Sequence, residues 1–429
     1  MRIKTLSAKP WKWTLMTIAV CFVILEANPG SPYPSMSVPT GSEETLVAHW
    51  LSETGTIANP YAVPSGPTAI VPPVYPALYA GLVKVFGYNI GTLWLLWILN
   101  FMFVSTALGL LPLITHRMGL GLYPGTIGAL LGAVFLHIHI DTNWNVFLST
   151  CLCVVLFTQL VNKPTDKSAI YLGLSLGLLI LAQPAFATMA APWSLLWLYD
   201  HAKLIKRFVI ISSMATLVVL PWIVRDYIQL GHPIFIRDGL GLELYSSNNF
   251  DAAPSFDENM KNGNHMKYSP NLNPSVAKDL VKAGEYNYFQ ERQRLALDWI
   301  KHNPRQFSVL TAKRFRLFWF PTPDPLVCLT GIRCYGPWVL TVLSFPGLWI
   351  LYKRNKRVSL MLGTTLILYP MLYYFVQFDV RYRYPIYWVS LLLAGITLTE
   401  LHNSTSRRNH EHKRNDRSRV VDKMSQAYL

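Results

Sequence analysis

The feature that most constrains this chain is a series of long apolar runs separated by short basic clusters. A hydrocarbon layer of about 30 Å is crossed by roughly 20 apolar residues in a helix, and charged residues make up only 14 % of the chain, against about 25 % in an average soluble domain. We therefore predict an all-α membrane protein of about ten transmembrane helices. The runs lie at 13–27, 90–113, 124–140, 144–161, 168–182, 184–199, 207–224, 336–352, 358–377 and 384–400.

Two features of these runs affect the predicted number of transmembrane helices. Residues 26–29 (Glu-Ala-Asn-Pro) are a poor cleavage site, so residues 1–27 are predicted to be an uncleaved N-terminal anchor rather than a signal peptide. The fifth and sixth runs are short, and Gln183-Pro184 between them leaves open a single kinked region.

Basic residues predict the orientation, because short cytoplasmic loops carry an excess of Lys and Arg. With the N-terminus inside, the inner segments hold 21 of the 38 Lys and Arg residues, and most of the others lie in the long segment 225–335. We expect a multi-pass protein of the plasma (inner) membrane with both termini cytoplasmic. Residues 90–224 then contain transmembrane helices 2–7, residues 336–400 contain helices 8–10, and residues 28–89 and 225–335 face outward.

The formal charge of +15 does not predict a nucleic-acid partner, because the basic residues lie between apolar runs rather than on a soluble face. The tail 401–429 is a basic cytoplasmic run, predicted to be disordered and to touch membrane lipids.

The outer segment 225–335 is predicted to be folded, since it mixes 14 basic with 11 acidic residues. Its first half is rich in loop-forming residues. Its second half predicts three helices, at 274–283, 285–302 and 304–320, with Asn273 and Pro274 starting the first and Gly284 closing it. The third helix is aromatic and basic, which leaves open an interfacial helix or an ordinary domain helix.

The first outer segment contains paired acids beside a stiff loop. Residues 41–52 have a helical pattern that includes Glu43 and Glu44, and residues 65–76 are too rich in proline for regular structure. One of these carboxylates is a candidate general base. The alternative is that both simply favour the positive end of a helix dipole.

Arginines near the predicted spans form a second group of candidates. Arg381 and Arg383 lie in a short outer loop, and Arg225 lies where the seventh span ends. Guanidinium groups at the hydrocarbon boundary call for an anionic partner, and a phosphate suits their planar donors. Pairing with Asp379 and extension to the interface is the alternative for the loop arginines.

Asp141 is a candidate second carboxylate at the outer end of the third span. His137 and His139 precede it, but on a helix the three side chains point apart, so a metal site requires an extended backbone. No cofactor is predicted, although a divalent metal stays open. Cys328 and Cys334 lie outside, where a disulfide is an open alternative to two free thiols.

Four segments together resemble a known family, the C-type polytopic membrane glycosyltransferases, in the branch of protein O-mannosyltransferases and aminoarabinose transferases. They are 65–76 (Ser-Gly-Pro-Thr-Ala through Val-Tyr-Pro), 221–227 (Pro-Trp-Ile-Val-Arg-Asp-Tyr), 241–249 (Gly-Leu-Glu-Leu through Asn-Asn) and 381–386 (Arg-Tyr-Arg-Tyr-Pro-Ile). The resemblance extends to about residue 400.

This resemblance implies a sugar donor on a polyprenyl phosphate, a general base on the first outer loop and basic residues near the lipid phosphate. Glu43 matches the acidic position, with Glu44 as its alternative, although Leu46 stands where the family has an arginine. Arg381 and Arg383 match the basic positions, and Asp141 falls where related enzymes place a second acid. The acceptor is a lipid, glycan or protein that the resemblance does not name.

No nucleotide-binding, metalloprotease or serine-hydrolase motif occurs, which fits a substrate that is already activated. The rival interpretation is a transporter or flippase of a lipid-linked sugar. Such proteins often contain inverted repeats, and no clear repeat is present.

Overall fold

The computed structural model describes residues 10–27, 42–135, 145–199, 203–322 and 335–427, with side chains to residue 406. Within these ranges the chain is helical and contains two isolated β-bridges but no strand. The prediction of an all-α protein is confirmed for this part of the chain.

Three helical segments are long and apolar enough to cross a membrane: Ile90–Arg117, Leu204–Leu230 and Val380–Ser406. Shorter apolar helices accompany them, and each of the ten predicted spans overlaps a helix. Those helices are α1 (Pro10–Glu26), α4 (Ile90–Gly109), α6 (Tyr123–Phe135), α7 (Val146–Leu160), α8 (Asp166–Ala182), α9 (Ala187–Leu198), α10 (Leu204–Leu230), α18 (Gly336–Arg354), α19 (Lys356–Met371) and α20 (Tyr384–Ala427).

The start of α20 lies at the centre of the apolar bundle, where its residues from Tyr384 to Ile396 are buried almost without interruption. Glycines allow neighbouring helices to approach it. A Cβ atom added at Gly395 would lie 2.0 Å from the carbonyl oxygen of Pro124 on α6, and one at Gly347 on α18 would lie 2.1 Å from that of Leu393. Small residues at helix contacts are typical of membrane bundles, because packing replaces the hydrophobic effect there.

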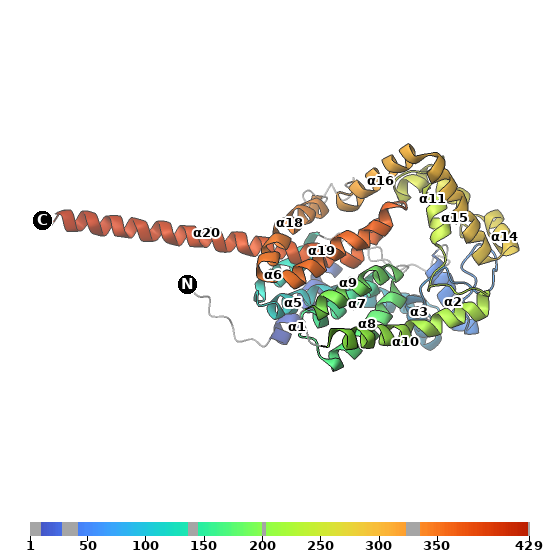
Figure 1. Cartoon of the computed structure of the whole chain (residues 1–429), viewed down its shortest axis with the longest axis horizontal. Helices are drawn as coiled ribbons and strands as arrows, with labels where there is room; N and C mark the ends of the chain where they lie inside the picture. The colour runs from blue at the N-terminus through green and yellow to red at the C-terminus, as the bar shows by residue number, and fades with distance from the viewer. Residues whose placement is uncertain (1–9, 28–41, 136–144, 200–202, 323–334, 428–429) are drawn as a thin grey trace.

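A second group of helices gathers at the end of the bundle opposite the chain termini (Figure 1). It has its own core, in which Val47, Ile70, Leu280 and Phe289 are buried together. The group comprises α2 (Glu43–Thr54), α11 (Leu240–Ser247), α12 (Phe256–Lys261), α13 (Asn264–Tyr268), α14 (Pro274–Ala283), α15 (Glu285–His302) and α16 (Pro304–Trp319), while α3 (Val74–Phe86) and α5 (Leu111–Arg117) extend the bundle.

The helices predicted for the outer segments are confirmed. Asn273 caps α14 by accepting from the amides of Ser275 and Val276, and Pro274 occupies its first position. The helices α15 and α16 follow at the predicted boundaries, and α2 covers the predicted 41–52 pattern. These helices were predictable because capping residues and apolar spacing are local signals.

The first half of 225–335, predicted to be rich in loops, contains the short helices α11, α12 and α13 joined by loops. The prediction of a disordered tail was wrong. The basic tail continues α20 as a helix to Ala427, projecting from the bundle (Figure 1). Residues 401–427 contain neither Pro nor Gly, so no residue there interrupts a helix that the buried part has already started.

Candidate functional site

The two acids of the first outer segment lie in the first turn of α2. Ser42 caps this helix, since its side chain accepts from the amide of Thr45 at 3.2 Å. Glu43 and Glu44 follow and are both half-buried. The helix dipole favours carboxylates at this position. The two acids therefore stabilise the start of α2, whether or not one of them also has a chemical role.

Charged groups from three other segments influence the pKa of Glu43. Burial raises the pKa of Glu43 to about 7, while the charge of Arg237 and, more weakly, that of Arg381 lower it and the charges of Glu44 and Glu243 raise it. A carboxyl group that titrates near neutral pH is suited to accept a proton during catalysis. These four residues and Glu43 are called the carboxylate–arginine cluster below.

Arg237 enters the cluster from a strained turn between α10 and α11. Ile236, a β-branched residue, has a φ of 67°, and Trp222 donates to its carbonyl oxygen at 3.3 Å. Positive φ values are rare for such residues, and where they persist the surrounding contacts impose them. The guanidinium group of Arg237 then lies 3.5 Å from the carboxylate of Glu243 on α11.

Arg381 is held by the residue two positions before it. Its side chain pairs with Asp379 at 2.9 Å, and Asp379 also accepts from the backbone amide of Arg381 at 3.0 Å. The predicted pairing with Asp379 is therefore present. The guanidinium group also lies over the ring of Phe256, 5.9 Å from its centroid, and the side chain remains 31 % exposed.

The segment before Arg381 is fastened to α11, α12 and the loop between them. Phe378 exchanges two backbone hydrogen bonds with residues 254–256, at 2.8 and 2.9 Å. Asn248 donates to the carbonyl oxygen of Phe375 at 2.9 Å, and Ser247 Oγ accepts from the amide of Gln377 at 2.7 Å. The position of Arg381 therefore depends on the fold of residues 245–256.

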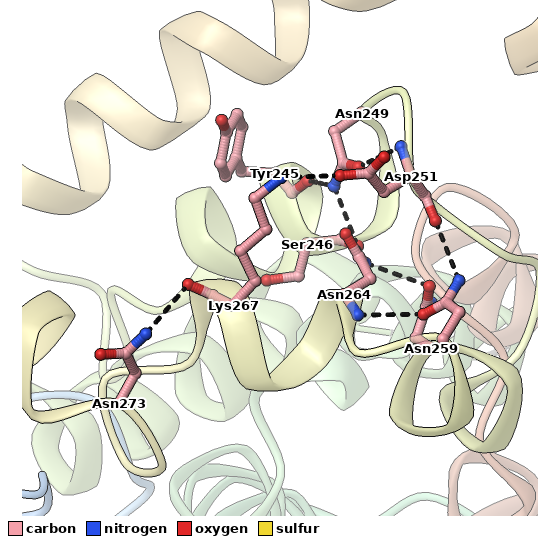
Figure 2. A network of polar contacts seen from close by, with 9 residues as sticks. Tyr245, Ser246, Asn249, Asp251, Asn259, Asn264, Lys267 and Asn273 are labelled. Carbon is pink, nitrogen blue, oxygen red and sulfur yellow. Dashed lines mark hydrogen bonds and ion pairs between the residues drawn. The ribbon is translucent and has the colours of Figure 1, made fainter.

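A network of amide side chains makes that fold rigid (Figure 2). Asn264 donates to Ser246 O at 2.8 Å and to Asn259 Oδ1 at 3.0 Å, and Asn259 donates in turn to Gln377 Oε1 at 2.7 Å. Lys267 pairs with Asp251 at 2.8 Å on the outer side of the same network. Asparagines hold this region because their side chains pair backbone groups that short helices leave unbonded.

The other two arginine candidates are bonded elsewhere. Arg383 is 2 % exposed and donates to the carbonyl oxygens of Phe318 and Trp319 and to Thr341 Oγ1, at 3.2, 3.0 and 2.6 Å. Arg383 therefore joins the end of α16 to α18. The structure thus separates Arg383 from Arg381, although they are two positions apart.

Arg225 holds the proline-rich loop against α10. It donates to the carbonyl oxygens of Ile57 and Thr68, both at 2.8 Å, and pairs with the buried Asp226 at 2.8 Å. Glu285 holds the same part of this loop, since it accepts from the amide of Ala69 at 2.7 Å. The loop is therefore fixed beside α2, as its prolines indicated.

Several predicted residues lie outside the described part of the chain. They are Asp141 with its neighbours His137 and His139, and Cys328 and Cys334 with their open disulfide. Among the residues that the structure does describe, no group of three or more His, Cys, Asp or Glu side chains is arranged to hold a metal ion.

Three charged or titratable residues near Arg381 were not predicted: Arg237, Glu243 and His265. Burial lowers the pKa of His265, on which Glu243, Arg381 and Asp379 also act through their charges. Glu243 lay within the segment 241–249 that carries the family resemblance, so a signal for it existed. Arg237 and His265 stand in no pattern that distinguishes them from other surface residues.

Comparisons of this chain with protein-family models, with curated proteins and with solved structures gave no match.

Proposed function

We propose that this protein is an integral membrane glycosyltransferase that moves a sugar from a polyprenyl-phosphate donor to an acceptor on the outer, periplasmic side of the plasma membrane. The observation that carries the proposal is the carboxylate–arginine cluster. It combines a half-buried carboxyl group, whose pKa burial raises to about 7, with two guanidinium groups whose charges act on it; one of them, Arg381, lies in a helical segment that is long and apolar enough to cross the membrane.

Glu43 is the general base in this mechanism. A hydroxyl acceptor is a poor nucleophile, and a carboxylate within about 3 Å removes its proton as the bond to the sugar forms. Glu44 is the alternative, because consecutive helical residues point about 100° apart and only one faces the acceptor. Asp141 remains a proposed second acid.

Arg381 is the proposed ligand of the donor phosphate. Cleavage of the glycosidic bond leaves a lipid phosphate, and fixed positive charge stabilises it as it departs. Arg237 is added as a second phosphate ligand because its charge also reaches Glu43. Arg383 and Arg225, proposed from the sequence for the same role, instead position α16 and the proline-rich loop, since their donors are bonded to carbonyl oxygens. The chemistry requires no cofactor, and a divalent metal at the phosphate is compatible with it.

The proposal is tested by mass spectrometry of cell-envelope glycans from a strain that lacks the gene. We expect one glycan to lose a sugar, and expect wild-type protein to restore it. Glu43→Gln keeps the size of the side chain but removes the basic oxygen, which costs on the order of 10²–10⁴-fold in rate, so this variant should not restore the glycan.

Glu53→Gln is the matched control, because Glu53 lies in the last turn of the same helix and its carboxylate is 56 % exposed. An unchanged glycan profile in the deletion strain contradicts the proposal. A lipid-linked sugar that accumulates on the inner leaflet identifies a transporter instead, and an active Glu43→Gln with an inactive Glu44→Gln moves the base by one residue.

The membrane topology is part of the proposal. Ten spans with both termini in the cytoplasm place Lys163 inside and Ser269 outside. Reporter fusions after these two residues should show those locations, and the opposite result at either one rules the topology out.

A further inference from the structure

The outer helices form a groove that is separate from the carboxylate–arginine cluster. Its volume is about 460 Å³, and it lies open to solvent between the loop that follows α11, the last part of α15 and the first turns of α16. Figure 1 shows these three helices meeting at one end of the molecule. The volume is within the range of about 300–1,000 Å³ that small-molecule sites occupy.

Aromatic side chains form two walls of the groove. Phe250 is 81 % exposed, whereas Trp299 is 8 % exposed, and their rings meet edge to face with centroids 6.2 Å apart. Trp299 also carries a buried indole N–H without a hydrogen-bond partner among the described residues. Buried donors of this kind are normally bonded, so a ligand oxygen that reached this nitrogen would complete its bonding.

The exposed position of Phe250 is imposed by its neighbours. Asn249 donates to Tyr245 O at 2.8 Å and accepts from the amide of Asp251 at 2.8 Å, and Asn262 donates to Asp251 O at 3.0 Å (Figure 2). The backbone on both sides of Phe250 is thus fixed. The ring of Phe250 is therefore held at the edge of the groove beside Trp299, where the apolar face of a ligand can contact both rings.

The polar residues of the groove favour an anion. Arg305 and Gln306, in the first turn of α16, line it, and no acidic residue among those that the structure describes does. Arg305 forms no ion pair or hydrogen bond within the part of the chain that the structure describes. A single guanidinium group with neutral amides beside it suits the single charge and planar shape of a carboxylate.

We propose that this groove binds a glycan whose sugars carry carboxylate groups. Phe250 and Trp299 contact the apolar faces of the sugar rings, Arg305 binds the carboxylate, and the amide of Gln306 faces the hydroxyl groups. The helix α11 carries Glu243 of the cluster in its first turn and ends at Ser247, three residues before Phe250, so one short helix connects the two sites. We therefore assign the glycan as the acceptor of the transfer reaction. This assignment rests on the proposed function, whereas the binding of the glycan to the groove does not.

Binding is measured on the full-length protein in detergent, without donor, by calorimetric titration with oligogalacturonate and with maltohexaose as the neutral counterpart. We expect the acidic oligosaccharide to bind at least tenfold more tightly. Arg305→Ala and Phe250→Ala should each weaken it about tenfold, which corresponds to the loss of one charged hydrogen-bond pair or one ring contact. Arg294→Ala, which removes an exposed arginine of α15 outside the groove, should bind as wild type.

Equal binding of both oligosaccharides overturns the assignment of charge, and absence of oligogalacturonate binding overturns the site. Retention of anionic vesicles of phosphatidylglycerol that depends on Arg305, without glycan binding, shows a membrane-contact surface instead. Glu43→Gln should bind oligogalacturonate normally, so a failure of transfer and a failure of this site are distinguishable.

Discussion

Arg314 on α16 is predicted to hold the candidate site together without taking part in its chemistry. Its guanidinium group is fully buried and donates to Asn248 Oδ1 and Phe375 O, both at 3.1 Å, and to Ser247 O. One side chain thus joins α16, the end of α11 and the segment that leads to Arg381. We predict that Arg314→Met loosens both of those segments.

The magnitude follows from which acceptors lose their only donor. Phe375 O keeps the bond from Asn248 Nδ2, so Ser247 O and Asn248 Oδ1 are the two acceptors affected. A buried acceptor without a partner costs about 1–3 kcal/mol, while methionine avoids the cost of burying a charge. We therefore expect a net loss near 3 kcal/mol in local stability.

Hydrogen exchange measured by mass spectrometry reports this loss directly. Since 1.4 kcal/mol is a factor of ten, amides in 245–256 and 375–380 should exchange about 100-fold faster in Arg314→Met than in wild type. Arg314→Lys keeps the charge but does not reach all three acceptors, so its exchange should be intermediate.

Arg316→Met is the control, because Arg316 is exposed on the same helix. It should leave exchange unchanged. Wild-type exchange in both segments of Arg314→Met would refute the reasoning, as would an equal effect from Arg316→Met.

The remaining predictions concern charged groups in and near the site. Since Glu43 is active when deprotonated, the transfer rate should rise with pH through about 7. Arg237→Gln removes a charge that lowers the pKa of Glu43, so it should shift this rise to higher pH in profiles of kcat/KM. An unchanged profile in this variant excludes Glu43 as the titrating base. Arg381→Ala should raise the KM for donor with little change in thermal stability. Arg383→Ala should instead lower the thermal midpoint of unfolding, because it leaves buried carbonyl oxygens unbonded. The reverse pattern would identify Arg383 as the ligand of the donor phosphate. Burial raises the pKa of Asp238 from 3.8 to about 8, so the folded state holds a proton that the unfolded chain releases, and stability should fall as pH rises between about 4 and 8. Asp238→Asn should be more stable than wild type at pH 8 and show a smaller fall over that range, and identical thermal midpoints at pH 5 and pH 8 in wild type would contradict this.

The sequence by itself determined which segments are helical and which of these helices are apolar. Each predicted span falls on a helix, and the caps at Ser42 and Asn273 start α2 and α14 where they stand in the sequence. These features depend on contacts within a few residues and on the transfer of apolar side chains out of water, so composition and spacing carry them. The same local signals placed Glu43 at the start of a helix.

Tertiary structure decided which charged residues meet. Arg381 and Arg383 look equivalent in the sequence, yet the charge of Arg381 acts on Glu43 of α2, whereas Arg383 is bonded to carbonyl oxygens of α16. Carbonyl oxygens belong to every residue, so a sequence contains no mark of the ones that will accept from a distant guanidinium group. Arg237 likewise reaches Glu43 only through a turn at Ile236 that local preferences disfavour and long-range packing imposes.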